Sequence, residues 1–283
     1  MNVINKKYKI IQKIGEGSFG CIYKCQNIRT DEYLAIKVEP IVNDTKLLKN
    51  ESTIYQYLQN TEGIPTIKWF GKDLKNYYMV IDLLGESLET IKKKYTVFSL
   101  KVVLQIGIKV INLLRLIHEK GLIHRDIKPE NFLLGFGNKK KNIYMIDFGF
   151  CKSYIRDGNH ILERKTSNLI GSPTYASINA HNFIELTRRD DLESLGYMLI
   201  YFYLGTLSWQ DISELSINET TNVNCTNDPN DINNKIKYLK ERILETNIPL
   251  VFIEYMKYVK QLEFSEKPNY ELIISILSKN NYI

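Results

Sequence analysis

Residues 124–131, which read His-Arg-Asp-Ile-Lys-Pro-Glu-Asn, combine side chains that could prepare a hydroxyl to attack a phosphoryl group. Phosphoryl transfer asks a protein mainly for positioning and for charge around the transferred group. The carboxylate of Asp126 could orient the attacking hydroxyl, and Lys128 places a positive charge two residues further on. This stretch therefore offers a base and a cation for that chemistry.

A second motif could supply the metal ion that holds nucleotide phosphates. Asn131 ends the first stretch, and Asp147 begins the sequence Asp-Phe-Gly at residues 147–149. An amide oxygen and a carboxylate are ligands that magnesium takes in proteins. The alternative is a helix–loop–strand segment with merely solvated charges, but two independent motifs would then have to occur in this order by chance.

A glycine-rich run lies upstream of both motifs. Gly15, Gly17 and Gly20 form a G-x-G-x-x-G pattern between strand-like segments at residues 8–11 and 22–25. Glycines let the backbone approach phosphate oxygens and present N–H groups to them. Such a run also fits a dinucleotide-binding turn or a plain hairpin. Strands on both sides favour a hairpin over the strand–turn–helix of a dinucleotide site.

Lys37 lies in an apolar, strand-like segment at residues 33–38, where an unpaired charge would be costly. Nucleotide phosphates and an acid on the following helix are the available partners. We expect that acid to be Glu51, within a helix-like run at residues 46–59, rather than Glu62, which lies beside a turn. A surface lysine–glutamate pair without a role in catalysis is the alternative interpretation.

These motifs resemble those of protein kinases, and the resemblance implies ATP as the phosphoryl donor and Mg²⁺ as the cofactor. It also implies an α+β, bilobal protein-kinase fold, with a small β-rich lobe and a larger helical lobe. The pattern of elements places the β-rich lobe at residues 1–82, a hinge at 83–85 and the helical lobe at 86–283. We expect residues 1–283 to form one protein kinase domain.

The adenine ring is expected in a cleft between these lobes, bonded to the backbone of the hinge. Ile81 would be the gatekeeper of the cleft, and Leu84 would make the main backbone contact. Ile14, Ile22 and Ala35 would form its apolar roof.

The composition is that of a soluble enzyme. With 283 residues, 44% of them hydrophobic, the chain can bury one large core or two smaller ones. Residues 195–207 form the most apolar stretch, which is too short and too aromatic for a membrane span and predicts a buried helix. The first residues show no secretory signal, and the four cysteines show no metal-ligand spacing. We expect a cytoplasmic or nuclear protein without a membrane partner.

The net charge of +6 includes two lysine clusters, at residues 92–94 and 139–141. Solvated surface turns explain such clusters by default, and an acidic partner or nuclear import is the alternative. The second cluster predicts the tip of a hairpin between residues 133–134 and 143–146. Residues 218–234, rich in Asn and Thr, predict a surface loop. No nucleic-acid-binding module is recognisable, so we expect no nucleic-acid partner.

Further blocks make the resemblance more specific. Residues 63–69, 83–89, 175–181 and 188–197 resemble the casein kinase 1 family, and the resemblance extends to residues 267–270. The third block contains Ser-Ile-Asn where most protein kinases have Ala-Pro-Glu. The vaccinia-related kinases share parts of this pattern but less of that block.

The casein kinase 1 resemblance implies a role for each chemical residue. It implies Asp126 as base, Lys128 as the cation on the transferring phosphate, Asn131 and Asp147 as magnesium ligands, and a Lys37–Glu51 pair. Asp191 would brace the backbone of the catalytic loop. Lysine at the second position after the base is the serine/threonine pattern. The family also implies activity without phosphorylation of the activation loop, and protein substrates with acidic or phosphorylated residues upstream of the target. We expect a monomer.

The chain departs from the family at Thr174, where an arginine usually helps to bind the upstream phosphate of a substrate. Arg164, Lys165, Lys235 or Lys237 could supply the missing charge. A catalytically inactive protein with the same fold is the main alternative function, and an enzyme acting on small-molecule hydroxyls is a more distant one. The first is disfavoured because every catalytic position carries the right chemical type.

Overall fold

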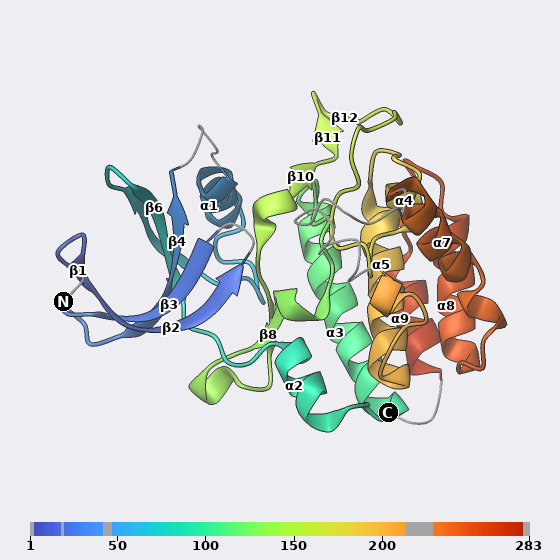
Figure 1. Cartoon of the computed structure of the whole chain (residues 1–283), viewed down its shortest axis with the longest axis horizontal. Helices are drawn as coiled ribbons and strands as arrows, with labels where there is room; N and C mark the ends of the chain where they lie inside the picture. The colour runs from blue at the N-terminus through green and yellow to red at the C-terminus, as the bar shows by residue number, and fades with distance from the viewer. Residues whose placement is uncertain (1–2, 18–19, 42–46, 213–228, 280–283) are drawn as a thin grey trace. The chain divides into compact units, whose positions relative to one another are not determined.

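The computed structural model describes residues 3–17, 20–41, 47–212 and 229–279. The chain divides into two compact units, and we describe each by itself. The first comprises Met1–Leu88 and Glu130–Gly149, and the second comprises Glu89–Pro129 and Phe150–Ile283. Strands dominate the first unit and helices dominate the second (Figure 1). The predicted α+β class is therefore confirmed, while the lobe boundaries assigned from the sequence stay a prediction.

A curled antiparallel sheet forms most of the first unit, with strand order β1-β2-β3-β4-β6-β5. The strands are β1 (Val3–Ile4), β2 (Tyr8–Gly17), β3 (Gly20–Asn27), β4 (Tyr33–Pro40), β5 (Ile67–Lys72) and β6 (Asn76–Asp82). β2 and β3 pair directly from Tyr8 opposite Asn27 to Gly17 opposite Gly20. The glycine run therefore lies at the end of a hairpin, as predicted.

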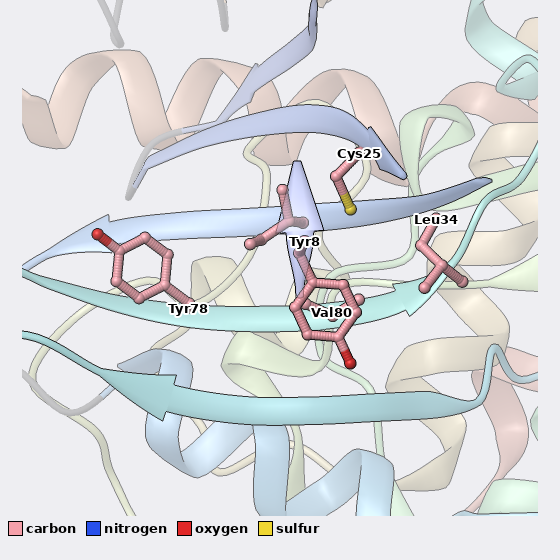
Figure 2. Packing of buried hydrophobic residues seen from close by; sticks show 6 residues of the cluster. Tyr8, Cys25, Leu34, Tyr78 and Val80 are labelled. Atoms are coloured by element: carbon pink, nitrogen blue, oxygen red, sulfur yellow. The ribbon is translucent and has the colours of Figure 1, made fainter. Parts of the chain in front are cut away.

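The two faces of this sheet have different contents because successive side chains of a strand point to opposite faces. One face carries a hydrophobic cluster of Tyr8, Cys25, Leu34, Ile36, Tyr78 and Val80 (Figure 2). On β4 the opposite face includes Ala35 and Lys37. Helix α1 (Leu47–Tyr57) contacts β5 and β6 and covers part of the sheet. The buried cluster thus fixes the register that presents Lys37 on the other face.

The last part of the first unit is a hairpin of β8 (Phe132–Leu134) and β9 (Ile143–Met145). A short 3₁₀ turn, η2 (Gly137–Lys139), lies between the strands, so the predicted hairpin with a lysine-rich tip is confirmed. The Met145 N–H donates to the carbonyl oxygen of Gly63 over 2.8 Å. This bond holds the segment before Asp147 against the segment that follows α1.

Helices form most of the second unit: α3 (Leu100–Glu119), α4 (Ile178–His181), α5 (Arg188–Leu204), α7 (Pro229–Glu241), α8 (Leu250–Gln261) and α9 (Tyr270–Ser278). α2 (Leu88–Tyr95) precedes them, and the short strands are β7 (Leu122–Ile123), β10 (Lys152–Ser153), β11 (Ile155–Arg156) and β12 (Asn159–His160). α5 packs between α3 and α8 and is buried along almost its whole length, which confirms the predicted buried helix (Figure 1). None of the helices in the described ranges combines the length and apolarity that a membrane crossing requires.

The predicted surface loop at residues 218–234 is wrong in its last part. Residues 229–234 belong to α7, while residues 218–228 lie outside the described part of the chain. Pro229 is compatible with helix at this point because the first helical position needs no backbone N–H donor and the ring already sets a helical φ. The Asn-rich composition concealed apolar positions such as Ile232 and Ile236, which are buried.

Candidate functional site

Lys37 is the centre of a charged cluster in the first unit. Its Nζ lies 2.8 Å from Oε2 of Glu51 and 3.4 Å from Oδ1 of Asp147. Glu51 is buried, on the same face of α1 as Leu48. Glu62, the alternative partner, is exposed. The pair expected from the sequence therefore forms, with Glu51 as the acid.

The charges of this cluster control the protonation of its members. Burial alone would lower the pKa of Lys37, but the carboxylates of Glu51 and Asp147 raise it above its usual value. Burial raises the pKa of Glu51, and the ammonium group of Lys37 opposes that shift. Lys37 is thus held in its charged form between two acids, and the cluster as a whole favours an added cation.

The position of Asp147 depends on α1 as well. Its backbone N–H donates to the hydroxyl of Tyr55 over 3.3 Å, and the Tyr55 ring meets Phe148 edge-on at 5.0 Å between centroids. Asp147 has a φ of 64°, in the left-handed region that a residue other than glycine seldom adopts. One helix therefore positions Glu51 through its own backbone and Asp147 through Tyr55.

Asn131 and Asp147 fit the demands of magnesium. The Ile146 N–H donates to the Asn131 carbonyl oxygen over 3.0 Å, which brings the two predicted ligands onto adjacent segments. Among the described residues, no group of three or more His, Cys, Asp or Glu side chains could hold a metal. Magnesium does not require such a group, since it takes one or two protein oxygens and completes its shell with water and phosphates. Bound there, the ion would neutralise phosphate charge.

The glycine hairpin presents bare backbone next to β4. Gly15 pairs with Ile22, and Gly17 pairs with Gly20 across the hairpin. A Cβ atom at Gly20 would clash with the Val38 carbonyl oxygen, so no larger residue fits. Residues 18 and 19 of the same run lie outside the described ranges.

The residues predicted to contact adenine lie close to Lys37 in the sheet. Ile22 is the direct cross-strand partner of Lys37, and Ala35 is that of Ile81, so these four side chains share one face. Ile14 falls in a β-bulge next to Gly15 and is 44% exposed.

Leu84 follows β6, in the connector that bonds to the β8–β9 hairpin. The neighbouring Gly85 donates its N–H to the Leu134 carbonyl oxygen over 2.8 Å. The connector at residues 83–85 is thus anchored within the first unit, and the adenine contact predicted for Leu84 stays a prediction.

In the second unit, Asp126 has a fixed orientation. Its Oδ2 lies 2.7 Å from Nζ of Lys128, and its Oδ1 accepts the Ser172 N–H over 3.0 Å. Only 3% of Asp126 is exposed. Both oxygens of the predicted base are therefore engaged, one by the predicted catalytic lysine and the other by a distant segment.

The carboxylate of Asp191 holds the backbone of the catalytic loop, as the family resemblance implied. It accepts the N–H groups of His124 and Arg125 at 2.7 and 2.8 Å, and lies 2.9 Å from Nε2 of His118. Burial would raise the pKa of Asp191, but the hydrogen bonds from His118 and His124 keep it below its usual value. Arg125 has a φ of 68°, and this anchor supports that uncommon backbone.

Three residues that contact the site escaped the sequence reasoning. They are Tyr55, which holds Asp147, Ser172, which holds Asp126, and His118, which contacts Asp191. Each acts on a residue far away in the sequence. Only Tyr55 could have been found from the sequence, because it lies four residues after Glu51 and so on the same face of the predicted helix.

A model of the protein kinase domain matches residues 8–281 of this chain. The chain belongs to the protein kinase family. The match includes the charged cluster of the first unit and the catalytic loop of the second. A protein kinase transfers a phosphoryl group from ATP to protein hydroxyls. The first unit of this kinase contains Glu51 and all the residues that we predict to bind the nucleotide or the metal ion. The second unit contains Asp126 and Lys128.

Glu51→Gln should lower kcat/KM for ATP by roughly a hundredfold, because Lys37 loses the partner that holds its ammonium group in place. Glu62→Gln is the matched control and should leave kcat/KM unchanged. Steady-state kinetics with a protein substrate, at equal amounts of folded enzyme by circular dichroism, measure both. Equal losses in the two variants would contradict the assignment of Glu51.

Proposed function

We propose that this kinase is an active serine/threonine protein kinase of the casein kinase 1 type. The observation that carries the proposal is a direct contact between two blocks that resemble that family. Ser177 Oγ donates to Oδ1 of Asp190 over 2.7 Å, and Asn179 Nδ2 donates to the same oxygen over 3.0 Å. The Ile178 N–H donates to Oε1 of Glu193 over 3.1 Å. The Ser-Ile-Asn sequence and the start of α5 thus form one interlocked unit, and this contact between the two family-like blocks supports the proposal.

The lysine next to the base supports serine and threonine as targets. Lys128 is paired with Asp126 at 2.7 Å, where its charge can follow the phosphoryl group as it approaches the hydroxyl. In the serine/threonine pattern this lysine occupies the second position after the aspartate, as it does here.

Each residue of the proposed mechanism has one task. Asp126 orients the substrate hydroxyl and accepts its proton, and Lys128 compensates the charge of the transferring group. Lys37, held by Glu51, would contact the α- and β-phosphates of ATP. Asn131 and Asp147 would hold Mg²⁺, which would supply charge neutralisation on the phosphates.

The proposed substrates are proteins with acidic or phosphorylated residues upstream of the target hydroxyl. The net charge of +6 and the basic residues around the segment before α4 support this preference. Of the candidates to replace the missing arginine, Arg164 is paired with Glu185 at 2.8 Å, and Lys237 bonds to Asn182 at 3.3 Å. Lys235 is exposed. We further propose that the enzyme acts as a monomer in the cytoplasm or the nucleus.

An inactive kinase-fold protein is the alternative, and it is not favoured. The base, the lysines and both predicted metal ligands carry the chemical types that catalysis requires. The contacts of Lys37 with Glu51 and of Lys128 with Asp126 support the active alternative.

Asp126→Asn should remove nearly all Mg-ATP-dependent phosphate transfer to acidic serine or threonine peptides, while nucleotide affinity stays unchanged. The reason is that the carboxylate acts on the hydroxyl in the transition state and not on bound ATP. Asp157→Asn, at an exposed position, is the control and should retain full activity. A wild-type protein that transfers no phosphate to such peptides would favour the inactive alternative instead.

Enzyme produced in bacteria and treated with phosphatase should keep its activity. The segment that leads into α4 is held by the Ser172 N–H bond to Asp126, and the start of α4 is held by bonds to Asp190 and Glu193, so we expect that the segment does not need a phosphate–arginine pair to order it. Radiometric assays before and after treatment measure the effect. A large loss that rephosphorylation within residues 149–175 restores would contradict this expectation.

Thr174→Arg should increase the preference for a peptide with phosphoserine three residues before the target. The added guanidinium offers a charge-assisted contact worth roughly 1.5–3 kcal/mol, so the primed-to-unprimed ratio of kcat/KM should rise about tenfold or more. Thr246→Arg adds the same charge at an exposed position in another segment and should leave the ratio unchanged. A wild-type ratio already near a hundred would show that another basic group has replaced the arginine.

A further inference from the structure

A buried lysine on α7 has contacts that none of the proposed catalytic roles explains. Lys240 is 0% exposed, and its Nζ lies 2.7 Å from the Pro173 carbonyl oxygen and 2.6 Å from that of Ala176. A third contact, at 2.9 Å, joins it to Nε2 of His181. The three hydrogens of an ammonium group thus have three acceptors.

The side chains around Lys240 fix its geometry and attract a positive charge at its Nζ. The rings of Tyr197 and Trp209 lie 5.0 and 5.6 Å from its Nζ, within the range of cation–π attraction. His181 Nδ1 lies 2.5 Å from Oδ1 of Asn233, which fits a ring that donates there and accepts from Lys240 at Nε2. Burial lowers the pKa of Lys240, and the charge of Glu193 opposes this shift. A charge buried at this cost requires all its partners.

The two carbonyl groups that Lys240 holds are the two sides of one turn. Within this turn the N–H groups of Tyr175 and Ala176 donate to the Ser172 carbonyl oxygen at 3.0 and 2.8 Å. Pro173 restricts the backbone of Ser172 to extended conformations, which makes the start of the turn stiff. Lys240 therefore clamps a short, rigid segment at residues 172–176.

The same turn contacts the predicted base. The Ser172 N–H donates to Oδ1 of Asp126 over 3.0 Å, one residue before the carbonyl that Lys240 holds. Gly171 has a φ of 89°, and a Cβ atom there would clash with the Arg125 carbonyl oxygen. The turn is thus packed tightly against the catalytic loop, and a shift of the turn would rotate or release the Asp126 carboxylate.

We infer that Lys240 is a positioning residue for catalysis: it clamps the turn at residues 172–176 and so orients the Asp126 carboxylate toward the substrate hydroxyl. The inference rests on the proposed kinase activity and names one of its determinants. Lys240 reaches the base only through Pro173 and Ser172. Its removal should therefore affect the transfer step and spare nucleotide binding.

Lys240→Met tests this inference, with Lys260→Met as the matched control. Lys260 is a partly buried lysine on α8 whose Nζ bonds to the Lys240 carbonyl oxygen at 3.3 Å. The two readouts are kcat per mole of folded enzyme at saturating ATP and peptide, and hydrogen–deuterium exchange of peptides covering residues 171–176. In Lys240→Met, kcat should fall by about a hundredfold at unchanged KM for ATP, and the turn should exchange faster. Lys260→Met should change neither.

Each outcome decides the inference. Unchanged exchange, or faster exchange with unchanged kcat, would overturn it, as would faster exchange spread evenly over the second unit. If Lys240→Met does not fold, Lys240→Gln keeps amide donors for the carbonyl groups without a buried charge. It should show a smaller loss of kcat with faster exchange at residues 171–176, and wild-type values for both would overturn the inference. A wild-type enzyme without transfer activity would refute the proposed function, while the exchange experiment would still test the clamp.

Discussion

The catalytic loop of the second unit depends on the hydrogen bonds that its backbone makes to the buried carboxylate of Asp191. This carboxylate lies in the first turn of α5 and receives two backbone N–H groups of the catalytic loop, from His124 and Arg125. Charge-assisted bonds of this kind contribute roughly 1.5–3 kcal/mol each. That energy offsets the conformational cost of the left-handed backbone at Arg125, the residue immediately before Asp126. The direction in which the predicted base leaves the backbone is therefore set by a helix that is itself almost fully buried.

The same helix also orders the segment before α4. Its first turn supplies Asp190, which accepts hydrogen bonds from the Ser177 hydroxyl and the Thr187 N–H, and one turn later Glu193 accepts the Ile178 N–H. Neighbouring acids thus serve two different loops: Asp191 holds the catalytic loop and Asp190 holds the Ser-Ile-Asn segment. Because α5 packs against α3 and α8, both loops are tied through its side chains to the core of this unit. The proposed independence from phosphorylation of the activation loop rests on this arrangement.

The sequence allowed the fold class, the hairpin of glycines and the Lys37–Glu51 pair to be predicted, because each depends on local pattern. Glu51 could be preferred over Glu62 because a helix phase places it beside apolar residues, and it lies on the buried face of α1. Contacts that depend on tertiary packing could not be predicted. Lys240 lies more than sixty residues from the turn that it clamps, and nothing in its neighbourhood distinguishes it from solvated lysines. The start of α7 was missed because its polar composition outweighed a few apolar positions.

Two lysines, Lys37, which is half-buried, and Lys240, which is fully buried, illustrate how the partner of a charge determines its use. Lys37 is held by carboxylates, which raise its pKa, so it stays protonated and can still attract a more highly charged partner such as a phosphate. Lys240 is held by two neutral carbonyl groups and an imidazole, and burial lowers its pKa. Neutral acceptors offer no charge that a mobile ligand could replace, and they fix direction through hydrogen-bond geometry. The first lysine is therefore suited to binding a substrate, and the second to fixing the backbone that holds the base.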